Sequence, residues 1–167
     1  MSKYEEMCQS VIEAQNRDAE YRDRCWRQLA TLYNGFLQYT QTPANRVTLL
    51  KWNGHDDETS RFSPPESGIG AYTIQGAAVL GSDGFWRLGI RIFLEPMATV
   101  WFAFFVAEQD GHPVTKVGDK TYRVDLDNSA TRGQLYDDIV ERIKDAFKGK
   151  KQNSKAIGFV VETALAS

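Results

Sequence analysis

The sequence contains few of the side chains that bind metals or form disulfides, with two histidines and two cysteines in 167 residues. Zinc sites use several such ligands at short spacings, and neither pair provides them. Cys8 and Cys25 are seventeen positions apart in one helical pattern. Because a helix rises about 1.5 Å per residue, they would lie roughly 25 Å apart, too far for a disulfide. The sequence therefore predicts two reduced thiols, no metal ion and no cofactor.

Long apolar runs and a charge imbalance are absent too. The longest nearly apolar run, Ala98 to Ala107, has ten residues, about half of the roughly 20 that cross a bilayer as a helix. The first twenty residues lack the apolar segment of a signal peptide. Twenty Lys and Arg against 22 Asp and Glu give a net charge of −2, so nucleic acids and anionic membranes have no general attraction for the chain. We expect a cytoplasmic protein with neither kind of partner.

Motifs that carry catalysis are missing from the sequence. There is no G-x-S-x-G nucleophile turn and no G-x-x-x-x-G-K-[ST] phosphate loop. Gly68 and Gly70 form a lone G-x-G with no third glycine. We therefore assign no catalytic residue. These absences favour a protein without enzymatic activity and leave open the alternative of an enzyme with a pocket on the sheet.

A long helix is predicted over residues 1–40. Ser2 and Glu5 match a capping box, in which each side chain satisfies a free backbone N–H of the other residue. Apolar residues then recur at helical spacing, first as a thin stripe that includes Met7, Val11 and Tyr21. An unbroken helix would measure about 57 Å, longer than a domain of this size is wide. Its first half therefore either projects or, if the polar stretch 15–24 breaks the helix, folds back. Asp18 argues against a long coiled coil, since it interrupts the apolar seam.

The rest of the chain predicts an antiparallel sheet and a second helix, which makes the fold class α+β. We expect a single domain of 1–167, with a sheet of five to six strands in 46–125, a helix at 129–149 and a final strand at 156–163. Residues 71–80 and 85–94 read as the two strands of a hairpin around the turn 81–84. Residues 53–70 read as a loop. Thr131 and Gln134 read as the capping box of the second helix, Gly149 as its C-cap, and its apolar stripe predicts packing on one sheet face.

The first candidate site is a protein-binding surface. A helix longer than its own domain has to bury its apolar stripe against a partner protein or a second copy. We expect this surface to include Met7, Val11 and Tyr21 of the helix, together with His55 of the long loop. The corresponding function is that of an adaptor, an inhibitor or an immunity-type protein.

The second candidate site is a pocket for a small anionic ligand on one face of the sheet. Arg87 and Arg91 are four positions apart in a predicted strand and therefore share a face. Neighbouring strands would add Gln75 and Trp101 to that face. Because a guanidinium donates two parallel hydrogen bonds, such a face could hold a carboxylate or phosphate, as a binding protein or an enzyme would. The alternative is a sheet face on which the arginine stems simply cover aromatic rings.

Overall fold

The computed structural model describes residues 1–52, 62–65, 70–96, 98–125 and 127–148, and the backbone of 159–163. The described elements follow one another along the chain as α1 (Lys3–Thr40), a short 3-10 turn (Ala44–Arg46), β1 (Val47–Trp52), β2 (Phe62–Ser63), α2 (Ile74–Ala77), β3 (Val79–Leu80), β4 (Trp86–Leu94), β5 (Ala98–Gln109), β6 (His112–Val117), β7 (Lys120–Tyr122), α3 (Ser129–Phe147) and β8 (Phe159–Thr163).

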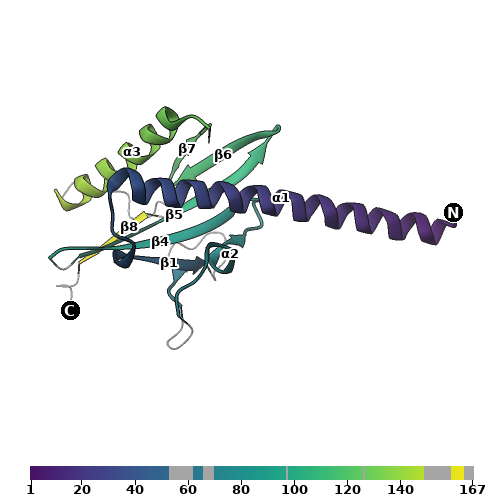
Figure 1. Ribbon diagram of the computed structural model, residues 1–167, viewed down its shortest axis with the longest axis horizontal. Coiled ribbons are helices and arrows are strands. Elements are labelled where there is room, and N and C mark those ends of the chain that lie inside the picture. Colours follow the sequence, from purple (N-terminus) through teal and green to yellow (C-terminus); the bar gives the residue numbers. More distant parts are fainter. Residues whose placement is uncertain (53–61, 66–69, 97, 126, 149–158, 164–167) are drawn as a thin grey trace.

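The strands form one antiparallel sheet in the order β2-β1-β4-β5-β6-β7, with β3 also paired to β4 and β8 also paired to β5. β4 to β7 make the expected meander, and α1 and α3 lie against the same face of the sheet (Figure 1). The α+β fold class is therefore confirmed. Within the described residues the sheet has eight strands, more than the five to six expected. The two additional strands, β2 and β3, have only two residues each.

The hydrophobic core lies between the sheet and the two long helices. Alternate residues of β4 and β5 point toward the helices, among them Leu88, Ile90 and Phe102, and all three are fully buried. They pack against Leu29 and Leu32 of α1, which are also fully buried. Burying each such side chain contributes about 2 kcal/mol relative to leaving it in water. The C-terminal half of α1 is therefore fixed on the sheet.

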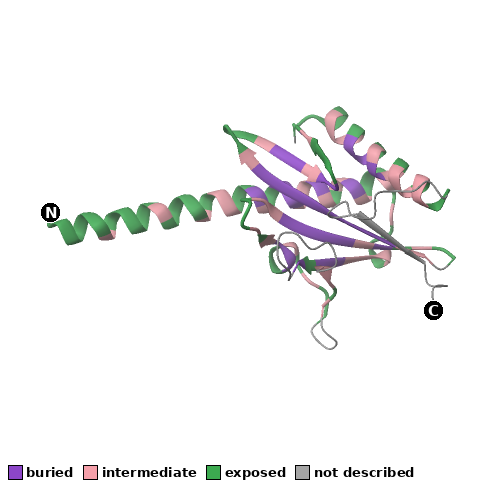
Figure 2. Ribbon diagram, turned by 180° about the vertical axis from the view of Figure 1, so that it is seen from behind, coloured by how far each residue is buried: buried purple, intermediate pink, exposed green. Residues whose placement is uncertain are grey.

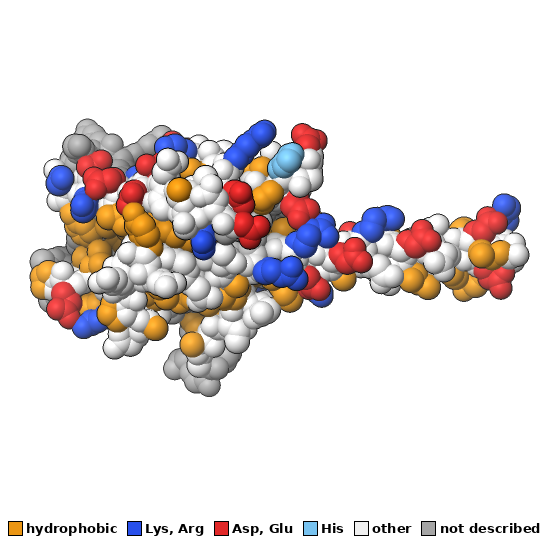
Figure 3. Space-filling model, turned by 45° about the horizontal axis from the view of Figure 1, so that its top comes forward, with side chains coloured by type: hydrophobic (Ala, Val, Ile, Leu, Met, Phe, Trp, Pro, Cys, Tyr) orange, Lys and Arg blue, Asp and Glu red, His pale blue; other side chains and the backbone are white. Residues whose placement is uncertain are grey.

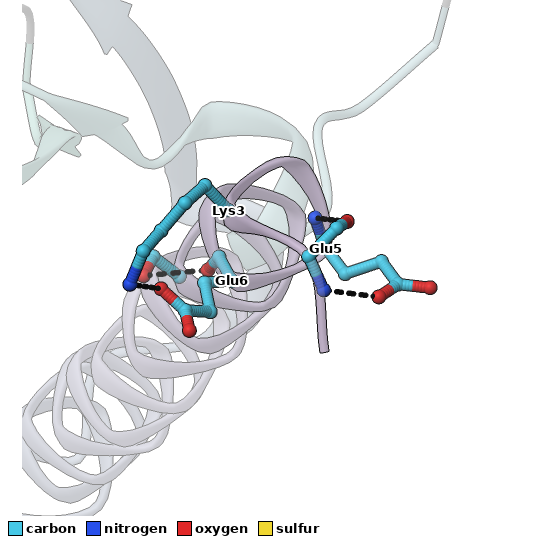
Figure 4. Close-up of polar contacts among 5 residues, drawn as sticks. Lys3, Glu5 and Glu6 are labelled. Carbon is cyan, nitrogen blue, oxygen red and sulfur yellow. Dashed lines mark hydrogen bonds and ion pairs between the residues drawn. The ribbon is translucent and has the colours of Figure 1, made fainter.

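Helix α1 is continuous over its 38 residues and begins with the predicted capping box (Figure 4). The Ser2 hydroxyl accepts from Glu5 N at 3.1 Å, and Ser2 N donates to the Glu5 carboxylate at 2.7 Å. Lys3 forms an ion pair with Glu6 one turn away, at 3.1 Å. The first half of α1 projects from the rest of the molecule and is mostly exposed (Figure 2). The alternative with a break in 15–24, which would fold the first half back, is therefore wrong.

Residues 71–80 differ most from the expectation. The predicted strand is instead the short helix α2, followed by only two strand residues in β3. The Thr73 hydroxyl accepts from Gly76 N at 3.0 Å and so acts as the N-cap of α2. The hairpin turn at 81–84 is present, and Gly84 adopts a left-handed conformation there, with φ of 83°.

Two further boundaries are corrected. The segment 53–70, expected as a loop, contains β2, whose Phe62 pairs with Trp52 of β1. The N-cap of α3 is Asn128 and not Thr131, because the Asn128 side chain accepts from Ala130 N at 2.9 Å. The Thr131 hydroxyl instead donates to backbone carbonyls at 128 and 125. Gly149, the expected C-cap, lies outside the described residues. The predicted final strand is confirmed as β8, which pairs with β5.

Candidate functional site

Large apolar side chains gather on the projecting half of α1. Five of the nine large hydrophobic residues that are exposed in the described chain lie within its first twelve positions. Their exposed fractions are 87% for Met1, 71% for Tyr4, 61% for Met7, 55% for Val11 and 50% for Ile12. Figure 3 shows apolar side chains along one side of the projecting helix and charged ones mainly along the other. We call the residues Tyr4, Met7, Val11 and Ala14 the projecting stripe.

The projecting stripe continues the face by which α1 packs on the sheet. From Met7 the stripe advances in steps of three or four residues, and the same steps lead on to Cys25, Leu29 and Phe36, which are buried. Such steps keep residues on one face of a helix. The same helix face is thus covered where the sheet lies beneath it and bare where the helix extends past the sheet.

Tyr21 marks the point where α1 leaves the sheet. Its hydroxyl donates to the Gly84 carbonyl at 3.0 Å and accepts from Glu108 N at 3.3 Å. Arg24 adds two hydrogen bonds to the Glu108 carboxylate, at 2.7 and 3.1 Å. Burial is the main cause that raises the pKa of Tyr21 to about 12. Tyr21, predicted as a partner-binding residue, therefore anchors α1 to the β3–β4 turn and to β5.

A hollow of about 390 Å³ lies at this same junction. Its lining residues come from α1, β3 and β4 and are Gln15, Asp18, Ala19, Tyr21, Arg22, Leu80 and Trp86. Leu80 is 48% exposed, although it is a large apolar residue. Trp86 packs edge-on against Trp26, and Arg22 lies 4.7 Å from the Trp26 ring centre. We call this feature the junction hollow. It adjoins the projecting stripe and is open and partly apolar.

The second face of the sheet, which points away from α1 and α3, holds Arg87 in a closed site. Its guanidinium lies between two rings, 4.4 Å from the centre of Trp52 and 4.9 Å from that of Phe105. Nη2 donates to Asp83 Oδ1 at 2.5 Å. Asp83 also accepts from Phe85 N at 3.1 Å, which fixes the β3–β4 turn. Arg87 is 1% exposed, so its charge is neutralised within the protein.

The register places Arg91 and Trp101 on the same face as Arg87, as predicted. Arg91 is half-buried and lies opposite Trp101 in the β4–β5 pairing. Trp101 is 8% exposed and packs at 5.5 Å from the ring of Phe62. Gln75 does not lie on this face, because it is an exposed residue of the helix α2. The prediction that Gln75 lies on a strand beside Arg87 is therefore wrong. Arg91 is thus the more accessible of the two arginines.

Sequence reasoning missed the tight packing of Phe62 over Gly89. A Cβ at Gly89 would lie 2.6 Å from the Phe62 ring and 2.7 Å from Leu50 Cβ. Phe62 therefore covers the second face only because position 89 has no side chain. A glycine at a regular position within a strand is the available signal for such a close approach.

A polar hollow of about 550 Å³ between β7 and α3 was also missed. Asp138 there accepts from Lys120 Nζ at 2.6 Å and from the Tyr122 hydroxyl at 2.8 Å. The hydrogen bond from Lys120 is the main cause that lowers the pKa of Asp138. Burial, together with the bond to Asp138, raises the pKa of Tyr122. These groups satisfy one another.

The remaining predicted features give no further site. His55 lies outside the described residues. In the part of the chain that the structure describes, no three His, Cys, Asp or Glu side chains are grouped so as to hold a metal ion. None of the described helices is both long enough and apolar enough to cross a bilayer. Comparisons with protein-family models, with curated proteins and with solved structures found no match.

Proposed function

We propose that the protein is a non-catalytic interaction module that binds another polypeptide through the projecting stripe of α1. The observation that carries this proposal is the bare continuation of a core-facing helix face. Met7 and Val11 occupy on the projecting half the positions that buried residues occupy on the packed half. Contiguous exposed apolar side chains of this kind are typical of protein interfaces.

The lack of packing on the first half of α1 supports the proposal. Most helical stability in proteins comes from packing of an apolar face. Besides their helical backbone bonds, the residues of α1 before Tyr21 have the Ser2 capping box and weak exposed side-chain contacts such as Lys3–Glu6. A partner on the stripe would supply the missing packing, as in helix-in-groove recognition.

The sheet-face alternative has less support. A carboxylate or phosphate would have to displace Asp83 and separate the Trp52 and Phe105 rings before it reached Arg87. Arg91 alone offers a single half-buried guanidinium on that face.

Two free thiols, Cys8 and Cys25, fit action in the reducing cytoplasm.

Site-specific photo-crosslinking in cells tests the proposal. A photoreactive amino acid at position 7 or 11 lies on the stripe, whereas one at Gln9 or Asn16 lies on the opposite, exposed face. We expect discrete crosslinked products from positions 7 and 11 and none from 9 and 16. Equal products from all four positions, or none from any of them, would refute the proposal.

A further inference from the structure

We infer that the partner of the projecting stripe is a second copy of this chain, paired antiparallel so that the first turns of each α1 seat at the junction hollow of the other copy. The inference rests on the proposed function and specifies its partner. It depends on the steric relation between the stripe, the edge of the sheet and the junction hollow.

The sheet limits how a second helix can lie on the stripe. The space in front of the stripe is free up to Tyr21, and beyond it the same space is filled by the molecule's own β4 and β5. A parallel partner helix would continue into that sheet, because α1 extends 19 residues past Tyr21 to Thr40. An antiparallel partner presents the capped start of its α1 at this edge instead. Only the antiparallel arrangement therefore lets the full stripe be covered.

The same arrangement brings complementary groups together. If the first turn of one helix lies beside Tyr21 of the other, residue n lies close to residue 22 − n by helical rise. Val11 then meets its own counterpart, and Met7 meets Gln15 at the rim of the hollow. Tyr4 meets Asp18, so its hydroxyl can donate to the one carboxylate that interrupts the stripe. Asp18 thus has a function in the paired state that it lacks in the monomer.

The area available is that of a stable dimer. Taking about 200 Å² for a fully exposed large side chain, Tyr4, Met7 and Val11 of the stripe offer about 370 Å² per copy at their exposed fractions. The junction hollow adds Leu80, which is 48% exposed. Two copies therefore bury about 900 Å² of apolar surface, which reaches the roughly 1,200–2,000 Å² of a specific interface once the polar side chains that flank the stripe are counted. The contact is isologous and closed, as in most homodimers.

Light scattering on the full chain gives the first test. We expect a mass of twice 18.9 kDa. Val11→Lys should weaken association at least about 100-fold, whereas Asn16→Lys on the opposite face should not. Leu80→Lys should weaken it as well, although Leu80 is not part of the helix, and Ser82→Lys in the adjacent exposed turn is its control.

Cys8 reports whether the two copies meet along the first half of α1. Cys25 is fully buried, so a bis-maleimide reaches Cys8 alone. Antiparallel helices crossing at Val11 place the two Cys8 residues about 13 Å apart, and we expect a crosslinked dimer that Val11→Lys abolishes.

A monomer of 18.9 kDa, or a dimer that survives both Val11→Lys and Leu80→Lys, would overturn the inference. Photo-crosslinking then distinguishes the two proposals. Products from positions 7 and 11 at a mass other than twice the chain would indicate a foreign partner, which keeps the proposed function and refutes the second copy. No product at either position removes both.

Discussion

Replacing Arg87 by alanine separates a structural arginine from a ligand-binding one. The substitution removes a side chain that is 1% exposed, stacked between Trp52 and Phe105 and bonded to Asp83. Its buried methylene stem contributes about 2 kcal/mol, and the two ring contacts contribute about 1–2 kcal/mol together. The bond to the partly exposed Asp83 adds about 1 kcal/mol. Relief of the buried guanidinium's desolvation offsets about 1–2 kcal/mol, so the net loss is about 3 kcal/mol.

Thermal unfolding followed by circular dichroism measures this loss. For a chain of this size 1 kcal/mol corresponds to about 2–4 °C, so Arg87→Ala should lower Tm by about 6–12 °C. Arg91→Ala is the matched control, because Arg91 is half-buried and lies opposite Trp101 on the same face. It should change Tm by no more than about 2 °C. Arg87→Lys should fall between them, since lysine keeps the charge but has no planar group to lie between two rings.

The opposite pattern would refute the structural reading of Arg87. If Arg87→Ala left Tm within about 1 °C of the parent while both alanine variants lost affinity for a small anion such as inorganic phosphate, the second face would be a binding site. The sheet-face alternative would then replace the interaction module.

Three further predictions concern individual contacts. Gly89→Ala places a Cβ against Phe62 and Leu50 and should lower the free energy of unfolding by about 1–3 kcal/mol in urea titrations, whereas Gly133→Ala, whose Cβ would be 3.7 Å from Tyr39, should not. Tyr21→Phe should lower the free energy of unfolding by about 1 kcal/mol at pH 8. Because the folded pKa of Tyr21 is raised to about 12 from 10.0, the stability difference between parent and variant is complete below pH 10 and should disappear as the pH rises through 12. A stability difference that persisted at pH 12.5 would contradict the assignment. Asp138→Asn should lower the free energy of unfolding by up to about 1 kcal/mol at pH 7. Because the folded pKa of Asp138 is lowered, the stability difference between parent and variant is present above pH 4 and should be lost as the pH falls further. A constant stability difference between pH 7 and pH 2 would count against the Lys120 contact.

The sequence predicted those features that depend on local pattern. The Ser2–Glu5 capping box and the helical steps of the stripe are local, and α1 was found to within a few residues. The alternation along β4 and the apolar character of β5 likewise placed the centre of the sheet. The strand predicted over residues 71–80 was wrong because two local preferences compete there. The β-type run ending in Val79 and Leu80 suggested a strand, and the Thr73 cap, which starts α2, was not considered.

The candidate sites depend on contacts that no local pattern contains. Arg87 and Trp52 are 35 positions apart, and nothing in the alternation of β4 indicates that one ring from β1 would close over the guanidinium. Shared faces follow from period and register, so Arg87, Arg91 and Trp101 were correctly grouped. Burial depends on which other segments pack against that face. The packing of Phe62 on it was not predicted, because Phe62 belongs to a segment that reads as a loop.

The turn at 81–84 belongs to both surfaces. Gly84 receives the hydroxyl of Tyr21, and Asp83, next to it, holds Arg87. The projecting half of α1 is about 30 Å long, and it is anchored at the same four-residue turn that holds Arg87 on the second face of the sheet. A displacement of the projecting half of α1 would therefore act on the same turn that positions Asp83 against Arg87.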